Sequence, residues 1–110
     1  MRRLFIAGNW KMNLSGSEAV ALVQDIKTRL DRSDVDVAVC PSFGYLAAVG
    51  ATLQGSAIAL GGQNLYPGAN GAYTGEVSAD MLQDLGCEYV ILGHSERRHI
   101  LKETDDFINL

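Results

Sequence analysis

Residues 88–98 read Glu-Tyr-Val-Ile-Leu-Gly-His-Ser-Glu-Arg-Arg, an apolar run followed by a glycine, a histidine and a charged turn. The run from Tyr89 to Leu92 predicts a buried strand over 88–93. Gly93 allows a tight turn at the end of that strand, and helix-favouring charged residues follow it. His94 therefore stands at a strand end, where the side chains of a reaction site gather in parallel α/β sheets.

Further apolar runs and amphipathic patterns alternate along the chain. The predicted strands cover residues 4–8, 35–40, 57–62 and 88–93. Because these runs are almost continuously apolar, they are typical of parallel strands that are covered on both faces. The segments between them predict helices over 15–30, 45–53 and 78–86, with Ser15 and Ser78 as N-caps. This alternation indicates an α/β chain with right-handed crossovers.

Alternation alone leaves two architectures open, a doubly wound sheet and a (β/α)8 barrel. The dinucleotide fingerprint G-x-G-x-x-G is missing after every predicted strand, and the sequence contains no P-loop. Polar residues instead recur just past the strands, at Asn9, Lys11, Ser42, Gln63, Asn64, His94 and Glu96. A barrel assembles one site from several strand ends at its carboxyl face, so this recurrence favours the barrel.

Composition excludes several classes of function. The net charge of −4 leaves no basic stripe to neutralise phosphates, so we expect no nucleic-acid partner. No apolar stretch reaches membrane-spanning length, so we expect no membrane partner. Cys40 and Cys87 lack metal-ligand spacing and are interpreted as buried thiols of a cytoplasmic protein. His94 and Glu96 match the H-x-E of zinc deaminases, but no P-C-x-x-C follows, which argues against zinc.

Lys11 and His94 are the strongest candidates for chemistry. Lys11 offers a positive charge for a phosphate or a developing oxyanion, although a lone lysine is more commonly a solvated surface residue. His94 would lie at the N-terminus of a short helix that begins near Ser95, where the helix dipole disfavours imidazolium. We therefore expect a neutral ring that donates a hydrogen bond. His99 has no evident partner and is interpreted as a surface residue.

Residues 64–76 form a long glycine-rich segment between the third predicted strand and the third predicted helix. The segment carries Tyr66, Tyr73 and Thr74, which are poor residues for a flexible linker. Loops of this length inside a compact domain are more often functional. We expect this loop to protrude and to insert into a partner through its aromatic side chains.

Three separated motifs resemble those of the triosephosphate isomerase family: residues 9–13 (Asn-Trp-Lys-Met-Asn), 71–76 (Gly-Ala-Tyr-Thr-Gly-Glu) and 89–98 (Tyr-Val-Ile-Leu-Gly-His-Ser-Glu-Arg-Arg). They stand in the family's order and at its spacing, and the resemblance covers essentially the whole chain. It implies the TIM (β/α)8 barrel and the interconversion of dihydroxyacetone phosphate and glyceraldehyde 3-phosphate in glycolysis and gluconeogenesis, through an enediolate. It implies neither a metal nor an organic cofactor.

The same resemblance implies roles for individual residues. Asn9 and Lys11 would bind the triose phosphate, with Lys11 also catalytic, and His94 would be the electrophile acting on the substrate's carbonyl and hydroxyl oxygens. Ser95 and Glu96 would organise the site. The loop that would enter a neighbouring subunit, and help to position its substrate-binding residues, carries Tyr73, Thr74, Gly75 and Glu76.

The chain supplies four predicted strands, whereas the family's barrel has eight. Residues 102–110 look like the start of a helix with Thr104 as its N-cap, so we expect an N-terminal half-barrel over 1–110, truncated within that helix. By resemblance, the catalytic glutamate, the mobile lid and the phosphate-binding loops belong to the second half. Neither Glu96 nor Glu103 matches the motif of that base. We therefore expect negligible isomerase activity from the chain alone.

Half a barrel would leave the edges of its first and last strands unpaired and would expose inner apolar side chains to water. We therefore expect a homo-oligomer, in which two copies could pair strand four of each with strand one of the other. Two further interpretations stay open: a non-catalytic, self-associating half-barrel scaffold, and a module that binds phosphate ligands. Ligand binding at Lys11 and His94 would favour a surviving site over a scaffold.

Overall fold

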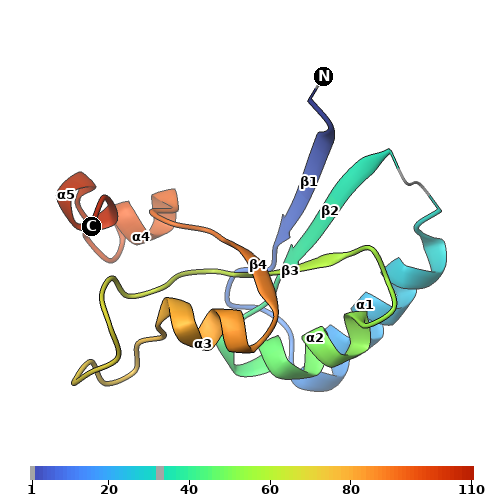
Figure 1. The fold of residues 1–110 in the computed structure, drawn as a ribbon, viewed down its shortest axis with the longest axis horizontal. Coiled ribbons are helices and arrows are strands. Elements are labelled where there is room, and N and C mark those ends of the chain that lie inside the picture. The colour runs from blue at the N-terminus through green and yellow to red at the C-terminus, as the bar shows by residue number, and fades with distance from the viewer. Residues whose placement is uncertain (1, 32–33) are drawn as a thin grey trace.

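A computed structural model of the chain describes residues 2–31 and 34–110. Its centre is one parallel sheet, in the order β1-β2-β3-β4 (Figure 1). The strands are β1 (Leu4–Asn9), β2 (Val35–Cys40), β3 (Ala59–Gly62) and β4 (Cys87–Val90). Each strand lies beside its successor in the chain, and a helix stands between each pair, as in half of a (β/α)8 barrel. The predicted fold class is confirmed.

Helices connect the strands and follow the last of them. They are α1 (Gly16–Arg29), α2 (Leu46–Leu53), α3 (Ala79–Asp84), α4 (Ser95–His99) and α5 (Asp105–Ile108), with a short 3-10 helix, η1 (Phe43–Tyr45), before α2. The described residues contain no helix whose length and apolar character would suffice to cross a membrane.

Local side-chain interactions begin the helices at the positions that the sequence predicts. Ser15 Oγ accepts a hydrogen bond from the Glu18 backbone N–H, and the Glu18 carboxylate accepts one from the Ser15 N–H, which forms a capping box. Ser78 and Thr104 cap α3 and α5 in the same way, each accepting from a backbone N–H three residues further on. These caps involve neighbours in the chain, so they can be predicted without knowledge of the fold.

Three of the strands differ from the prediction at their ends. β1 extends to Asn9 rather than to residue 8, β3 begins at Ala59 rather than at residue 57, and β4 covers 87–90 rather than 88–93. The pairing of β3 with β4 is irregular between Leu60 and Gly61, so the ladder shifts there. Beyond β4, the Ile91 N–H still donates to the Gly62 carbonyl at 2.9 Å. His94 therefore follows β4 through a short link instead of directly ending the strand.

The hydrophobic core lies between the sheet and the layer formed by α1, α2 and α3 (Figure 1). Each of these helices and two of the strands contribute buried side chains to it. The core residues are Ala19, Val23, Val39, Leu46, Val49, Leu53, Ile58, Leu60, Val77 and Leu82. Close packing extends into the sheet, because a Cβ at Gly61 would lie only 2.7 Å from Cys40 Sγ.

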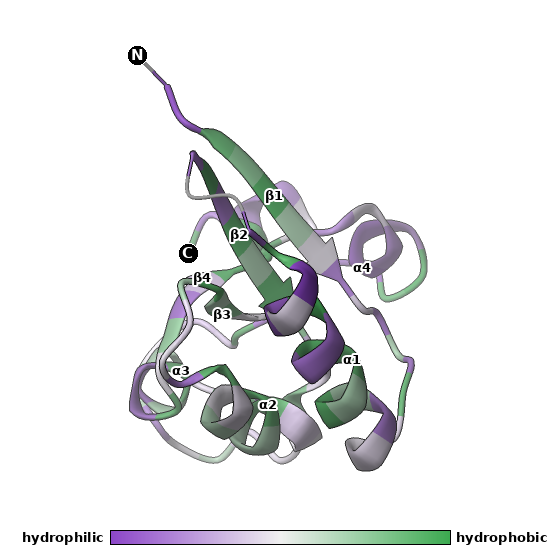
Figure 2. Ribbon diagram, turned by 90° about the vertical axis from the view of Figure 1, so that its right-hand side faces the viewer, coloured by the Kyte–Doolittle hydropathy of each residue, from purple (hydrophilic) through white to green (hydrophobic). Residues whose placement is uncertain are grey.

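The other face of the sheet is concave. The rings of Phe5 on β1 and Tyr89 on β4 have centroids 4.8 Å apart, although these are the two outer strands. A flat sheet with strand spacings of about 4.8 Å would hold the outer strands ~14 Å apart, so the ring contact indicates a curled sheet. Leu4, Phe5 and Ile6 are 65%, 48% and 60% exposed, and no described helix covers the start of β1 (Figure 2).

Candidate active site

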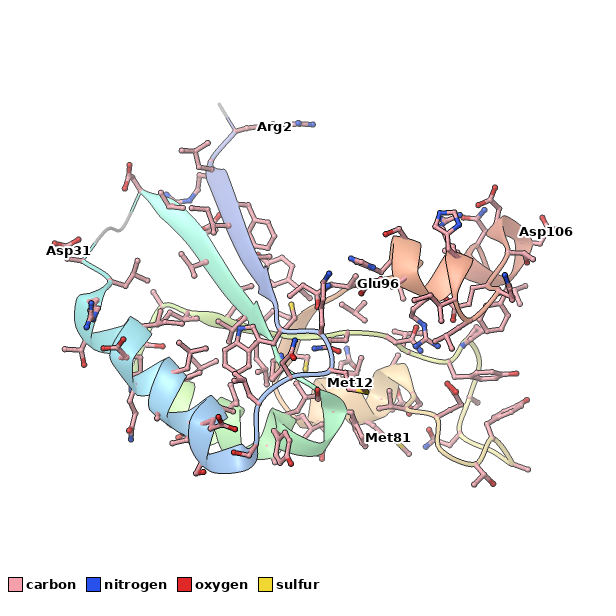
Figure 3. All side chains as sticks on the ribbon, turned by 180° about the vertical axis from the view of Figure 1, so that it is seen from behind. Arg2, Met12, Asp31, Met81, Glu96 and Asp106 are labelled. Carbon is pink, nitrogen blue, oxygen red and sulfur yellow. The ribbon has the colours of Figure 1, made fainter. Side chains whose placement is uncertain are left out.

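A cleft of about 720 Å³ lies at the carboxyl ends of the strands. Met12, in the loop after β1, and Glu96, in α4, are both part of its lining and are labelled near the middle of the view in Figure 3. Polar residues at or beyond the ends of all four strands line the cleft, namely Asn9, Lys11, Asn13, Ser42, Gln63, Asn64, His94 and Glu96. The fold thus brings together the polar residues that the sequence places after separate strands.

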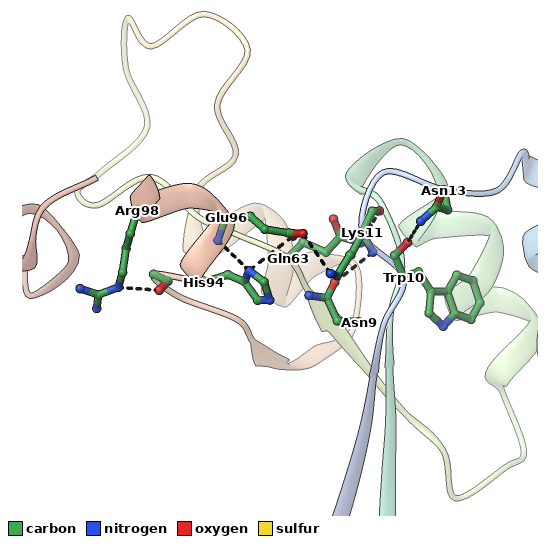
Figure 4. Close-up of polar contacts among 9 residues, drawn as sticks. Asn9, Trp10, Lys11, Asn13, Gln63, His94, Glu96 and Arg98 are labelled. Carbon is green, nitrogen blue, oxygen red and sulfur yellow. Dashed lines mark hydrogen bonds and ion pairs between the residues drawn. The ribbon is translucent and has the colours of Figure 1, made fainter. Parts of the chain in front are cut away.

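Lys11 and Glu96 form an ion pair across this cleft (Figure 4). Lys11 Nζ donates to Glu96 Oε2 at 2.9 Å, and both side chains are about half exposed. The hydrogen bond from Lys11 is the main reason that the pKa of the Glu96 carboxyl lies below its usual value. Partial desolvation opposes this effect, whereas the positive charge of Lys11 reinforces it. Glu96 is therefore ionised at neutral pH and partly neutralises Lys11.

The backbone of Lys11 adopts a conformation that is uncommon for a residue with a side chain. Its φ is +56°, in the left-handed region. The Lys11 N–H donates to Asn9 Oδ1 at 3.0 Å. The Lys11 carbonyl accepts hydrogen bonds from Ser42 Oγ at 3.0 Å and from Gln63 Nε2 at 2.8 Å. Gln63 Nε2 also donates to the Cys40 carbonyl at 2.8 Å, so the loops after β1, β2 and β3 are tied together at Lys11.

His94 is the N-cap of α4, and its Nδ1 accepts a hydrogen bond from the Glu96 backbone N–H at 3.1 Å. An imidazolium has no lone pair to accept this bond, so the ring that makes it is neutral and carries its proton on Nε2. Nδ1 also lies 3.4 Å from Glu96 Oε1. Lys11, Glu96 and His94 therefore form one connected group, in which a specific cap holds the ring.

The turn before His94 depends on a glycine. Gly93 has a φ of +59°, and a Cβ at this position would lie 2.7 Å from Ile108 Cδ1. Arg98 Nε donates to the Gly93 carbonyl at 2.7 Å, and the Arg98 guanidinium also forms an ion pair with Asp105. Contacts from α4 and α5 thus fix the peptide that carries His94.

The remaining predicted site residues are less closely associated with this group. Ser95 begins α4, is exposed, and is not part of the cleft lining. In the glycine-rich loop, Gly75 and Glu76 line the cleft, but Tyr73 and Thr74 do not. The ring of Tyr73 instead packs against that of Tyr66, with centroids 4.3 Å apart, so this part of the loop folds onto itself.

The carboxylates among the described lining residues are Glu76 and Glu96. Glu96 is paired with Lys11, whereas Glu76 belongs to no ion pair within the described parts of the chain. Glu103 lies outside the cleft, where its nearly buried carboxylate accepts from Arg97 Nε at 2.9 Å. Across residues 2–31 and 34–110, no three His, Cys, Asp or Glu side chains are grouped closely enough to hold a metal ion.

Sequence reasoning missed the contacts made by Ser42, Gln63 and Arg98. The sequence marks Ser42 and Gln63 as polar residues after strands, and that position was the available signal for them. Nothing in the sequence indicates that both would bind the same carbonyl. Arg98 appears in the sequence only as part of a charged turn, because its acceptor depends on how α4 packs.

Comparison with known proteins agrees with the motifs and the fold. A family model described as triosephosphate isomerase matches residues 4–110. The chain is 54% identical to a triosephosphate isomerase of Herpetosiphon aurantiacus over 110 residues, which cover 99% of this chain and 44% of that protein. It is 56% identical to the one of Syntrophotalea carbinolica, with the same shares of the two chains covered. The chain thus spans less than half the length of these relatives. It belongs to the triosephosphate isomerase family and corresponds to the family's N-terminal portion.

Proposed function

We propose that this chain supplies the substrate-binding and electrophilic part of a triosephosphate isomerase active site. The observation that carries the proposal is the connected group in the cleft, where Lys11 Nζ lies 2.9 Å from Glu96 Oε2 and the Glu96 backbone N–H donates to His94 Nδ1 at 3.1 Å. A cation beside a neutral imidazole suits a phosphorylated substrate whose carbonyl oxygen gains negative charge during the reaction.

Each residue of the group has a distinct role in this proposal. The Lys11 ammonium attracts the triose phosphate and stabilises negative charge that develops on it. His94 Nε2–H donates a hydrogen bond to the substrate oxygens, while the cap on Nδ1 keeps the ring in that tautomer. Glu96 orients both partners, and Asn9 holds the Lys11 N–H. A neutral histidine that polarises the substrate carbonyl is characteristic of the triosephosphate isomerase family, so the resemblance contributes to the assignment.

Removal of a proton from carbon requires a base, and the described cleft offers few candidates. Glu96 is engaged by Lys11, and Glu103 is engaged by Arg97. Glu76, on the glycine-rich loop, is the carboxylate that remains. We infer that the 110-residue chain alone isomerises triose phosphates negligibly. A polypeptide matching the rest of the relatives' length would supply the base and complete the site.

A coupled isomerase assay tests this proposal. The purified chain should show negligible turnover alone, and mixing with the C-terminal remainder of a relative should produce turnover. His94→Gln should abolish that gain, whereas His99→Gln, at an exposed position of the same helix, should retain it. Turnover by the chain alone at the level of a complete enzyme would overturn the proposal. A weak activity that Glu76→Gln removes would identify the loop carboxylate as a base.

A second candidate function, a self-associating scaffold, is favoured by the exposure of β1. Leu4, Phe5 and Ile6 are apolar and exposed on a strand at the edge of the sheet, and β4 forms the opposite edge. We propose that a second copy covers these residues by pairing its β4 with β1. Light scattering should then show an oligomer that Ile6→Lys dissociates, whereas Met81→Lys, at an exposed position of α3, leaves it intact. A monodisperse monomer of the unaltered chain would contradict the scaffold.

A further inference from the structure

Ser42 stands directly before a short helix, at a position where a serine side chain usually caps the helix that it precedes. It is the N-cap of η1, yet its side chain makes no capping hydrogen bond. An N-cap serine normally accepts from a backbone N–H of the first helical turn. The Ser42 hydroxyl instead donates to the Lys11 carbonyl at 3.0 Å, across 31 positions of the chain. The hydroxyl therefore connects the loop after β2 to the loop after β1.

The Lys11 carbonyl is the point at which two donors meet. A backbone carbonyl has two lone pairs, and here Ser42 Oγ and Gln63 Nε2 each donate to it. With the Lys11 N–H also bound to Asn9 Oδ1, both peptide groups that flank the Lys11 Cα are held. Fixing these two peptides fixes φ and ψ, and hence the direction in which the side chain leaves the backbone.

We propose that Ser42 is a positioning residue, whose hydroxyl keeps Lys11 in its left-handed conformation and thereby directs the Lys11 amine onto Glu96. Non-glycine residues seldom adopt a φ of +56°, so the conformation requires support from the surroundings. Without the hydroxyl, the Lys11 carbonyl keeps Gln63 Nε2 as a donor but loses the second one. The Lys11 peptide is then held less firmly, and the amine spends less time on Glu96 Oε2. The consequence for catalysis rests on the proposed function, because it assumes that Lys11 binds the substrate.

Ser42 is a cleaner test of this idea than Gln63. Gln63 Nε2 also donates to the Cys40 carbonyl, so its loss would disturb the pairing at the end of β2 as well. The Ser42 hydroxyl has the Lys11 carbonyl as its acceptor, and its removal leaves the Gln63 contacts in place.

The test measures the Lys11–Glu96 pair directly in the 110-residue chain. Carboxyl-detected NMR follows the titration of Glu96, whose pKa is lowered mainly by the Lys11 hydrogen bond, and the Lys11 backbone shifts report φ. Ser42→Ala should raise the pKa of Glu96 toward its usual value and move the Lys11 shifts. Ser42→Thr, which retains a hydroxyl, should restore both. The matched control is Ser56→Ala, because Ser56 Oγ also donates to a backbone carbonyl, that of Leu53, but outside the cleft.

The outcomes separate this proposal from the proposed function. An unchanged Glu96 titration and unchanged Lys11 shifts in Ser42→Ala would overturn the role of Ser42, as would an equal change in Ser56→Ala. Binding of glycerol 3-phosphate, a triose phosphate analogue that cannot isomerise, is measured in parallel. Ser42→Ala should weaken it by roughly threefold to tenfold, the effect of one lost hydrogen bond. Absence of binding by the unaltered chain would count against the proposed function, while the NMR result would still decide the role of Ser42.

Discussion

Lys11 Nζ lies 2.9 Å from Glu96 Oε2, although 85 positions separate the two residues in the chain. Lys11 follows β1 and Glu96 belongs to α4, which follows β4, so the pair joins the two outer strands of the sheet. Half-exposed ion pairs contribute little to stability, because solvent screens them and two long side chains must be ordered. The importance of this pair is therefore orientation: it holds the Lys11 ammonium on Glu96, whose backbone N–H caps the neutral ring of His94.

Acidification should destabilise the chain in part through Glu96. The pKa of this carboxyl lies below its ordinary value of 4.5, chiefly because Lys11 donates a hydrogen bond to it. A carboxyl with a lowered pKa in the folded state contributes stability above its unfolded pKa, and this contribution is lost as the pH falls through the folded pKa. Urea denaturation at a series of acidic pH values should show a smaller pH-dependent loss for Glu96→Gln than for the unaltered chain.

Glu18 provides the comparison for this experiment. Hydrogen bonds from the Ser15 backbone and side chain lower the pKa of Glu18, which belongs to α1 and is not part of the cleft lining. Glu18→Gln should also reduce the loss of stability at acidic pH, independently of Glu96→Gln. The reductions caused by the two substitutions should therefore add. Identical pH profiles for Glu96→Gln and the unaltered chain would contradict the role of the Lys11 hydrogen bond.

Gln63→Ala should destabilise the fold by about 1–3 kcal/mol, because it removes two hydrogen bonds to backbone carbonyls, one of them partly buried. The measurement is the free energy of unfolding from urea titration. Gln83→Ala removes the same side chain from an exposed position of α3 and should change this free energy by less than about 0.5 kcal/mol. Equal effects of the two substitutions would show that the Gln63 contacts do not hold the loops together.

Gly93→Ala should destabilise the fold more than alanine at two comparison glycines. Gly93 combines a φ of +59° with the approach of Ile108, so both backbone strain and a steric clash oppose a side chain. Gly55→Ala meets only the strain, since its φ is +81° and no atom lies within 4 Å, and should cost about 1–2 kcal/mol. Gly44→Ala meets neither.

The free energy of unfolding should therefore be highest for Gly44→Ala, lower for Gly55→Ala and lowest for Gly93→Ala. Hydrogen exchange in Gly93→Ala should increase first in α5, which packs against this glycine through Ile108. A Gly93→Ala variant as stable as Gly44→Ala would mean that the turn before His94 does not depend on glycine.

Leu46→Ala should reduce the free energy of unfolding by roughly 2–5 kcal/mol, because Leu46 is 1% exposed and lies in the core between α2 and the sheet. Leu110→Ala provides the matched control, since Leu110 is 84% exposed, and should have an effect below about 0.5 kcal/mol. Urea denaturation of both variants would detect the difference. A small effect at Leu46 would place the core elsewhere than between the helices and the sheet.

Much of the local structure could be predicted because its causes lie within a few residues of each other. The caps at Ser15, Ser78 and Thr104 join side chains to backbone groups three positions away. Strand boundaries were less accurate, and β4 ends at Val90 rather than at residue 93. The register shift between Leu60 and Gly61 leaves Glu88 of β4 without a partner in the ladder. Because this shift depends on how β4 pairs with β3, the apolar pattern within 88–93 does not indicate where β4 would end.

The alternation of strands and helices, the helix starts, and the polar residues at the strand ends could be read from the amino-acid sequence, because these follow from side-chain periodicity and short-range hydrogen bonds. Which of those polar residues meet depends on the folded arrangement of the strands. The contact of Phe5 with Tyr89 and the pairing of Lys11 with Glu96 bring the two outer strands together and follow from the curl of the sheet. The convergence of Ser42 and Gln63 on one carbonyl follows from the order in which the strands lie side by side. That curl arises from how the helices and strands pack together. The packing depends on contacts between residues that are distant in the chain.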